Sequence, residues 1–361
     1  MNWNWQLPSW PNFEFDVRSL LPQEQKFLVG AGEIRGAMRA VPSLDQTEFI
    51  SETIAIEALT TSRIEGEILN RESVQSSILK QLGIKHLERK ASAAEQGISQ
   101  LLVAVYRDFA EPLTHERLWE WHALVLQGRS DVPDLGRYRT DPSPMQIVSG
   151  SISDPKVHFE APPAGLVTKE MDTFLAWFSE AEHPPLTKAG LAHLYFESIH
   201  PFSDGNGRMG RALCDVAISR SLGYPSLTLL SRTIQARQSE YYSQLQQAST
   251  TLMVDSWLSW FANCAIEAQA KSIQTVDFVV AKARIFAQHG EKLNARQEKA
   301  LLRVFKEGPD GFLGGLSASN YAKITGASPA TVTRDLAELV EMKILDKTGE
   351  NRGARYSLRL S

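Results

Sequence analysis

Residues 200–211 read His200-Pro201-Phe202-Ser203-Asp204-Gly205-Asn206-Gly207-Arg208-Met209-Gly210-Arg211. Apolar residues recur with helical spacing before this stretch, from about Thr187 to Ile199, and again after it, from Ala212 to Leu222. The sequence therefore predicts a loop between two helices. Arg211 falls in the first turn of the second helix, whose free backbone N–H groups and dipole should point back at the loop.

The loop combines residue types that bind phosphate. Gly205 and Gly207 let the backbone approach a ligand closely, and with Asn206 they can form a concave row of donors at a helix N-terminus. Arg208 and Arg211 add charged forks for the outer phosphates. A lone Gly-x-Gly is usually a turn, so it is the whole block that favours an anion site.

Two side chains of the same loop supply a metal ligand and a base. Asp204 is a hard oxygen ligand that can hold Mg²⁺ already bound to phosphates. His200 can take a proton from an incoming hydroxyl near neutral pH. Alone, such an aspartate is more often a helix cap and such a histidine a partner of the helix dipole. Together, these residues predict attack of a hydroxyl on a bound nucleotide phosphate.

Residues 200–211 resemble the signature of the Fic family, His-Pro-Phe-x-Asp/Glu-Gly-Asn-Gly-Arg-x-x-Arg, at every defined position. The resemblance covers a core from roughly residue 100 to 265. It implies a mainly α fold, with a β-hairpin at residues 145–161 that serves as a target-docking flap. The implied activity is that of a protein adenylyltransferase, which transfers AMP from ATP to a Ser, Thr or Tyr hydroxyl of a protein, including itself. Family members that use other nucleotides or phosphocholine exist, so the nucleotide stays open.

The resemblance also implies a role for each residue of the site. His200 is the general base, and Asp204 is the Mg²⁺ ligand. The nucleotide-binding residues are Gly205, Asn206 and Gly207 around the α- and β-phosphates, Arg208 as a phosphate clamp, Arg211 at the γ-phosphate and Tyr241 at the nucleoside pocket. ATP and Mg²⁺ are therefore the expected substrate and metal ion.

A second resemblance concerns regulation. A predicted helix that begins near Ser43 carries the stretch Thr61-Ser62-Arg63-Ile64-Glu65-Gly66-Glu67. This stretch is similar to the family's inhibitory helix, Ser/Thr-x-x-x-Glu-Gly/Asn, in the form that precedes the core. The resemblance implies that Glu65 pairs with Arg211 and displaces the γ-phosphate contact, whereas spacing alone would make Glu65 a surface glutamate near a helix end. In the family this glutamate can also orient a hydrolytic water, so removal of AMP by the same site is a third, weaker interpretation.

The C-terminal residues 291–361 differ in charge and pattern from the rest. They carry 12 Lys and Arg against 9 Asp and Glu, a net charge of +3, which leaves −7 for the remainder of the chain. Two predicted helices joined by a glycine turn precede a strand, a glycine-rich tip and a strand, which predicts a winged helix-turn-helix domain. The residues placed to contact DNA are Thr331, Thr333 and Arg334 on the second helix and Arg352 and Arg355 at the wing. The modest charge leaves dimerisation or protein docking as the alternative.

The chain is therefore expected to have three parts. These are an N-terminal extension with the inhibitory helix (1–99), a Fic core with a connecting helix (100–290) and the winged helix-turn-helix domain (291–361). Residues 1 to about 30 are too irregular for a helix and too aromatic for a floppy tail, so they are interpreted as a scaffold or as a contact in a homodimer. This start also looks like the N-terminal extension of a bacterial Fic subset that often carries a C-terminal winged helix.

Composition restricts the possible partners. The chain carries 38 Lys and Arg against 42 Asp and Glu, a net charge of −4, which excludes indiscriminate binding to nucleic acid or membranes. No apolar run approaches the roughly 18 residues of a spanning helix, and the first residues do not resemble a signal peptide, so a cytoplasmic protein without a membrane partner is expected. Cys214 and Cys264 lie in apolar helical patterns and are expected to be buried free thiols.

Two functions from different classes follow from the sequence. One is a self-restrained nucleotidyltransferase that modifies a protein hydroxyl. The other is a DNA-binding transcriptional regulator whose Fic core senses nucleotide. The two can coexist in one chain.

Overall fold

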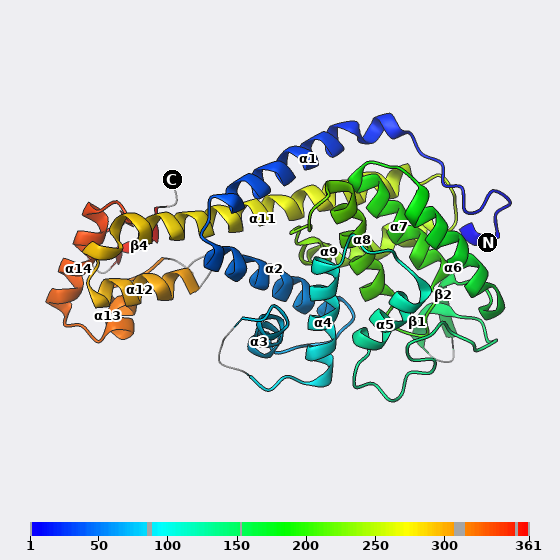
Figure 1. The fold of residues 1–361 in the computed structure, drawn as a ribbon, viewed down its shortest axis with the longest axis horizontal. Coiled ribbons are helices and arrows are strands. Elements are labelled where there is room, and N and C mark those ends of the chain that lie inside the picture. The colour runs from blue at the N-terminus through cyan, green and yellow to red at the C-terminus, as the bar shows by residue number, and fades with distance from the viewer. Residues whose placement is uncertain (1, 85–88, 152–153, 307–314, 351–352, 360–361) are drawn as a thin grey trace. The chain divides into compact units, whose positions relative to one another are not determined.

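The computed structural model describes residues 2–84, 89–151, 154–306, 315–350 and 353–359 (Figure 1). The chain forms two compact units, a larger one of residues 1–31 and 50–270 and a smaller one of residues 32–49 and 271–361. Helices dominate both units, as predicted. Within the described ranges, no helix combines the length and apolar character needed to cross a membrane.

Three helices contribute residues to both units, namely α1 (Val17–Arg39), α2 (Ser43–Ile64) and α11 (Asp255–His289). The helices wholly within the larger unit are α3 (Arg71–Gln81), α4 (Ala93–Arg107), α5 (His115–Val125), α6 (Ala164–Glu180), α7 (Pro185–Ile199), α8 (Asn206–Leu222), α9 (Leu230–Ala236) and α10 (Gln238–Ala248). Short 3-10 helices cover Asn4–Gln6 and Gly290–Lys292.

Helices α7 and α8 form the centre of the larger unit and lie side by side (Figure 1). Almost every residue of α7 is buried because its sequence is apolar on all faces, with Tyr195 and Phe196 among its largest buried side chains. Pro185 opens α7, where its fixed φ suits the first turn. Gly223 ends α8 in the left-handed region, with a φ of 72°. Packing on all sides thus holds both ends of the loop that joins the two helices.

The hairpin predicted near residues 145–161 is confirmed. Strands β1 (Gln146–Ser151) and β2 (Asp154–Glu160) pair antiparallel, with Gln146 opposite Glu160. The register shifts between Ile147 and Val148, which marks a bulge in β1. The hairpin precedes α6 in the chain and belongs to the larger unit.

The N-terminal residues pack against the larger unit through their tryptophans. The indole N–H of Trp5 donates to the Glu160 backbone oxygen at 2.7 Å, and that of Trp10 donates to Glu170 Oε2 at 2.8 Å. The prediction that residues 1 to about 30 form no helix is wrong beyond residue 16, because α1 begins at Val17. The sequence there does carry a helical stripe, in which Leu20, Glu24 and Phe27 are buried at spacings of four and three. The aromatic and proline-rich start masked that stripe.

The smaller unit contains α12 (Ala295–Lys306), α13 (Ala318–Thr325), α14 (Pro329–Glu341) and the antiparallel strands β3 (Leu345–Thr348) and β4 (Arg355–Leu358). Side-chain caps start two of these helices, since Ser317 Oγ accepts the Asn320 N–H at 3.1 Å and Ser328 Oγ accepts the Thr331 N–H at 3.5 Å. Gly326, with a φ of 71°, makes the turn between α13 and α14. Buried Asp335 accepts from Arg296 Nε at 2.8 Å and thereby ties α14 to α12.

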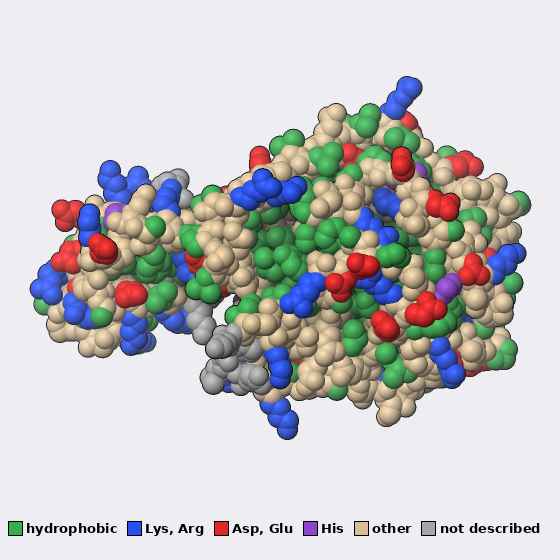
Figure 2. Space-filling model, viewed as in Figure 1, with side chains coloured by type: hydrophobic (Ala, Val, Ile, Leu, Met, Phe, Trp, Pro, Cys, Tyr) green, Lys and Arg blue, Asp and Glu red, His purple; other side chains and the backbone are tan. Residues whose placement is uncertain are grey.

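The residues predicted to face DNA are partly described. Thr333 and Arg334 on α14 are exposed and Thr331 is half-buried, while Arg355 is exposed at the start of β4. Arg352 lies outside the described residues. On the face shown in Figure 2, Lys and Arg side chains over α12–α14 are interspersed with Asp and Glu. Arg334 itself lies 3.9 Å from Glu338 of the same helix.

Candidate active site

The loop between α7 and α8 is held by backbone geometry and one carboxamide. His200 ends α7 in the left-handed region with a φ of 48°, and Gly205 precedes α8 with a φ of 80°. Asn206 Oδ1 accepts the Phe202 N–H at 3.0 Å, and Asn206 Nδ2 donates to the Phe202 backbone oxygen at 2.8 Å. The Asn206 side chain therefore fixes the loop, and its backbone N–H remains as the group it can offer to an anion.

The first turn of α8 presents backbone donors toward the loop. The Met209 N–H makes the first intrahelical bond, to the Gly205 backbone oxygen at 3.1 Å. The N–H groups of residues 206–208 precede it and have no intrahelical acceptor. They are the positive end of the helix dipole, where an anion is stabilised.

Arg211 is buried and held by α2. Its guanidinium Nε donates to Thr61 Oγ1 at 2.8 Å, and Nη2 donates to the Thr61 backbone oxygen at 3.0 Å and to Glu65 Oε1 at 2.7 Å. The Arg211 side chain is only 1% exposed. Burial alone would lower its pKa, but the nearby carboxylates, Glu65 first, outweigh burial and raise the pKa.

A second ion pair lies beside the first. Arg208 Nη1 donates to Glu67 Oε2 at 2.8 Å and to the Val125 backbone oxygen at 3.3 Å. Glu65 and Glu67 flank Gly66, which adopts a φ of 80° at the end of α2. Both arginines of the loop signature are thus paired with carboxylates from one short segment.

The Glu65 carboxylate lies directly over the first turn of α8. A Cβ placed on Gly207 would come within 2.4 Å of Glu65 Oε1 and 3.1 Å of Arg211 Nη1. Glycine is therefore required at this position for the carboxylate to approach the helix end. The negatively charged Glu65 carboxylate thus occupies the place that the sequence predicts for phosphate.

His200 has a carboxylate neighbour that the sequence analysis did not single out. Its Nδ1 lies 3.6 Å from Glu197 Oε2, one helical turn earlier on α7. Burial by itself would raise the pKa of Glu197, but His200, His193 and Arg211 outweigh burial and lower that pKa. Glu197 therefore stays ionised beside His200.

Arg139 also positions this loop. Its Nε donates to the His200 backbone oxygen at 2.8 Å, and its Nη2 donates to the backbone oxygens of Pro162 and Ile199. The Arg139 backbone N–H donates to the Pro201 oxygen at 3.0 Å. Burial lowers the pKa of Arg139 to about 10, so the guanidinium remains charged at neutral pH.

His122 supports the loop from α5. Its ring stacks on Phe202, with centroids 4.0 Å apart and an angle of 10° between the planes. Nδ1 accepts the Gly136 N–H at 3.0 Å, so the proton is on Nε2, which lies 3.1 Å from the Asp204 backbone oxygen and donates to it. Burial lowers the pKa of His122 to about 4 and keeps the ring neutral.

Asp204 lies partly exposed in the loop, with 44% of its side chain accessible. Its Oδ1 accepts the Gly205 N–H at 2.6 Å, and Oδ2 lies 3.6 Å from Arg129 Nη1. Among the described residues, no group of three or more His, Cys, Asp or Glu side chains is placed to hold a metal ion. One accessible carboxylate fits an ion that arrives with phosphate oxygens as its other ligands.

Tyr241 on α10 is buried like Asn206, Arg208 and Arg211, with 1% of its surface exposed. Its hydroxyl lies 2.7 Å from His193 Nε2 of α7. The structure thus brings together His200, the residues from Asp204 to Arg211, and Glu65. Tyr241 lies near enough to Arg211 and Glu65 for their charges to affect its pKa, which burial raises well above its usual range. No spacing in the sequence pointed to Glu197, Arg139 or His122.

Comparison with protein families assigns the centre of this site. Residues 112–218 match the Fic/DOC family. This part of the chain is similar to Fic domains. It includes α5, the hairpin, α6, α7 and most of α8. Residues 3–84, which include Glu65, match a second family described as a domain of unknown function (DUF4172).

Relatives of the Fic domain carry the name protein adenylyltransferase. The chain is 28% identical over 142 residues to protein adenylyltransferase fic-1 of Caenorhabditis elegans and 32% identical over 143 residues to protein adenylyltransferase Fic of Nematostella vectensis. These alignments cover 38% and 39% of this chain but only 25% and 30% of the relatives. The chain therefore matches less than a third of their length.

Two solved structures share the fold. A Fic family protein from Desulfovibrio desulfuricans matches with a TM-score of 0.52 at 23% identity, covering 94% of this chain and 96% of that one. A Fic domain containing signalling protein from Bacteroides thetaiotaomicron matches with a TM-score of 0.53 at 18% identity, covering 70% of this chain and 96% of that one. At these identities the likeness concerns the fold alone.

Proposed function

We propose that this chain is a protein adenylyltransferase that transfers AMP from ATP to a protein hydroxyl, and that Glu65 holds it inactive. The observation that carries the proposal is the Glu65 carboxylate, which lies 2.7 Å from Arg211 and directly above the first turn of α8. A site that holds one anion in this way has the donors to hold a phosphate. The adenylyltransferase names of the Fic relatives support the choice of ATP.

The phosphate groups would be bound by α8 and its two arginines. The backbone N–H groups of residues 206–208 face the α- and β-phosphates, and Arg208 and Arg211 contact the outer phosphates once their glutamates have moved. Arg208 Nε and Arg211 Nη1 are buried and lack a hydrogen-bond partner among the described residues. Buried charged donors of this kind are costly unless a ligand satisfies them.

His200 would act as the general base. The oxygen of the target hydroxyl forms a bond to the α-phosphorus, the bond from that phosphorus to the bridging oxygen breaks, and pyrophosphate leaves. The hydroxyl proton passes to His200, and the Glu197 carboxylate 3.6 Å from Nδ1 stabilises the imidazolium that results. Arg139 keeps His200 in place through its backbone oxygen, so Arg139 is a positioning residue.

Asp204 is the side chain that would hold Mg²⁺, because its carboxylate is accessible at the end of the loop. Bound there with the nucleotide, Mg²⁺ would neutralise charge on the phosphate oxygens. His122 holds the Asp204 backbone oxygen and thereby sets the direction of this carboxylate.

The reaction is tested by following labelled ATP. In a Glu65→Gly background, label on the α-phosphate should appear on protein and label on the γ-phosphate should not. Adding His200→Ala should abolish the labelling while ATP still binds. Equal labelling from both positions, or labelling that survives His200→Ala, would contradict AMP transfer by this site. Loss of AMP from a labelled protein on prolonged incubation would instead indicate removal of AMP by the same residues.

A second function is proposed for residues 291–361, which we assign as a winged helix-turn-helix domain that binds DNA. The order α12, α13, α14, β3 and β4, with Gly326 between α13 and α14, favours this assignment. Sequence-selective DNA retention by the full chain that weakens with salt and with Arg334→Ala would support it. No retention of DNA by the full chain would favour protein docking as the role of this domain.

A further inference from the structure

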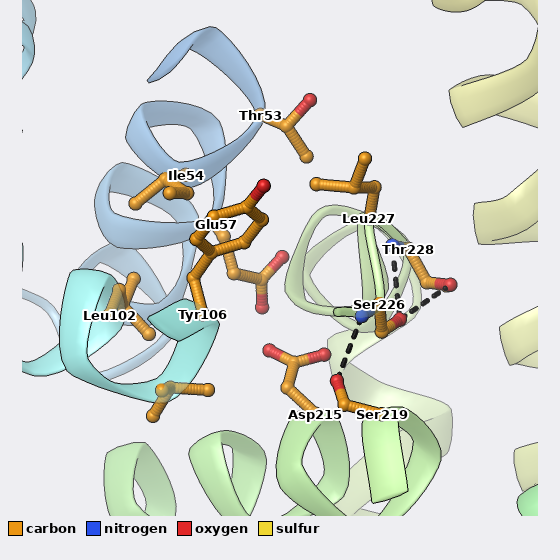
Figure 3. Close-up of a pocket in the computed structure, with 11 residues that line it drawn as sticks. Thr53, Ile54, Glu57, Leu102, Tyr106, Asp215, Ser219, Ser226, Leu227 and Thr228 are labelled. Atoms are coloured by element: carbon orange, nitrogen blue, oxygen red, sulfur yellow. Dashed lines mark hydrogen bonds between the residues drawn. The ribbon is translucent and has the colours of Figure 1, made fainter. Parts of the chain in front are cut away.

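A cavity of about 30 Å³ lies in the larger unit between α2, α4, α8 and residues 226–228 (Figure 3). The cavity is separate from the loop between α7 and α8, and the residues that line it are buried or half-buried. Its volume is enough for a single water molecule or a dehydrated ion. The polar residues that line it are Thr53, Glu57, Asp215, Ser219, Ser226 and Thr228.

Two carboxylates from different helices meet at this cavity. In Figure 3, the side chains of Glu57 on α2 and Asp215 on α8 point toward one another. Both Glu57 oxygens accept the Ser231 N–H, at 3.0 and 3.2 Å. Asp215 is only 9% exposed, and its Oδ1 has no hydrogen-bond partner among the described residues. The Glu57 carboxylate thus has a hydrogen-bond donor, whereas one buried oxygen of Asp215 has none among the described residues.

The charge at this place is not balanced by the lining. None of the described residues that line the cavity is Lys, Arg or His. Burial raises the pKa of Glu57 to about 7, and burial together with Glu57 raises the pKa of Asp215 well above its usual range. These shifts favour the protonated carboxyls, and a cation bound between the two side chains would take the place of the protons.

We propose that this cavity binds a divalent cation through the carboxylates of Glu57 and Asp215. The available donors are carboxylate and hydroxyl oxygens, which suit hard cations. Since Mg²⁺ gives up its water shell reluctantly and the cavity has little room for water, the site favours Ca²⁺ or Mn²⁺. Hydroxyl groups of Ser226 and Thr228 also line the cavity.

The cation would join the same two helices as the inhibitory ion pair. Glu57 lies on α2, eight residues before Glu65, which directly follows that helix, and Asp215 follows Arg211 by four residues on α8. A cation bound to both carboxylates therefore holds α2 on α8 and favours the contact between Glu65 and Arg211. This consequence for activity rests on the proposed function, whereas cation binding itself does not.

Binding is tested with Mn²⁺ on the full chain without nucleotide. Asp204→Asn is present throughout, so that the Fic loop contributes no carboxylate ligand. Electron paramagnetic resonance should show one bound Mn²⁺ per chain, displaced by Ca²⁺, and Asp215→Asn should weaken binding at least about ten-fold, a loss of about 1.4 kcal/mol. Glu48→Gln, which removes an exposed carboxylate from α2 outside the cavity, should leave binding unchanged.

Two results would contradict the proposal of a cation site. One is no Mn²⁺ binding at concentrations up to about 1 mM, the weak end of protein Ca²⁺ sites. The other is binding that Asp215→Asn and Glu57→Gln leave unchanged. Circular dichroism checks the fold of each variant, and Glu57→Gln decides the question if Asp215→Asn does not fold.

The expected effect of the bound cation on AMP transfer is measured separately. With Mg²⁺ and ATP fixed and Asp204 intact, added Ca²⁺ should lower AMP transfer by the wild type several-fold more than by Asp215→Asn. An equal effect in both proteins would contradict the coupling. If no variant transfers AMP while Mn²⁺ binding depends on Asp215, the proposed function fails and the cation site stands.

Discussion

The carboxylate of Glu65 lies 2.7 Å from the guanidinium of Arg211, although 146 residues separate them in the chain. The pair joins the end of α2 to the first turns of α8. Thr61 adds two more acceptors for the same guanidinium. Arg211 cannot contact a phosphate fully until this set of acceptors gives way, so the resting chain is expected to be a poor transferase.

The ion pair between Glu67 and Arg208 is expected to add to this restraint. About a third of the Glu67 side chain is exposed, so the pair contributes at most about 1 kcal/mol, or a factor of about five. We predict that Glu67→Gln raises the initial rate of AMP transfer by up to that factor. Glu72→Gln, at an exposed carboxylate at the start of α3, serves as the control. A rate below that of the wild type would mean that Glu67 supports the site rather than restrains it.

Gly207 is expected to be required for nucleotide binding. A methyl group there would fill the space next to Arg211 Nη1, which lies 3.1 Å from the position of a Cβ. In the Glu65→Gly background, Gly207→Ala should weaken ATP binding by at least about ten-fold, measured by calorimetry. The matched control is Gly165→Ala in the first turn of α6, where a Cβ meets nothing within 4 Å. Similar ATP affinity in both alanine variants would place the phosphates elsewhere.

Arg139 should affect stability and catalysis together. Arg139→Leu leaves the backbone oxygens of His200 and Pro162 without their charged donor, at a cost of about 3 kcal/mol in the free energy of unfolding. In the Glu65→Gly background it should lower kcat more than it raises KM, because it misplaces the base. Denaturant unfolding and steady-state kinetics measure the two effects. Arg137→Leu, at a largely exposed arginine, should leave kcat unchanged.

His122 makes stability depend on pH with a defined sign. Its pKa is lowered from 6.5 to about 4, so the folded state binds fewer protons than the unfolded state between these values. The contribution of the neutral His122 ring to the free energy of unfolding is complete above about pH 6.5. It decreases by about 3 kcal/mol as the pH falls toward 4. The difference in unfolding free energy between the wild type and His122→Gln should therefore narrow between about pH 8 and pH 5. A difference that stays constant would show that His122 does not titrate with folding.

The sequence predicted the parts of the site that are contiguous in the chain. The loop between two helices, the hairpin and the approach of Glu65 to Arg211 were all expected from residues 61–66, 145–161 and 200–211. Composition and periodicity were enough to predict the loop and the hairpin, whereas the approach of Glu65 to Arg211 was implied only by the family resemblance. The roles assigned to these residues remain proposals that the experiments above test.

The supporting residues were not predictable in the same way. Arg139 and His122 reach the loop from 61 and 82 residues away, and neither belongs to a pattern that implies contact. Glu197 lies one turn before His200 inside a helix that is apolar on all faces, where a carboxylate gives no periodic signal. The helix α1 was missed because tryptophans and prolines dominate the preceding residues, although the stripe from Leu20 to Phe27 was present.

The most direct test of the inhibitory contact compares initial rates of AMP transfer from α-labelled ATP, with Mg²⁺, by the wild type, Glu65→Gly and Glu65→Gln. Glu65→Gln keeps the shape of the side chain and removes its charge, which separates electrostatic restraint from steric blocking. The expected result is at least about ten-fold faster transfer by Glu65→Gly and an intermediate rate for Glu65→Gln, as loss of a buried charged contact predicts. Equal rates for all three proteins, with ATP bound by each, would contradict the claim that Glu65 restrains this site through Arg211.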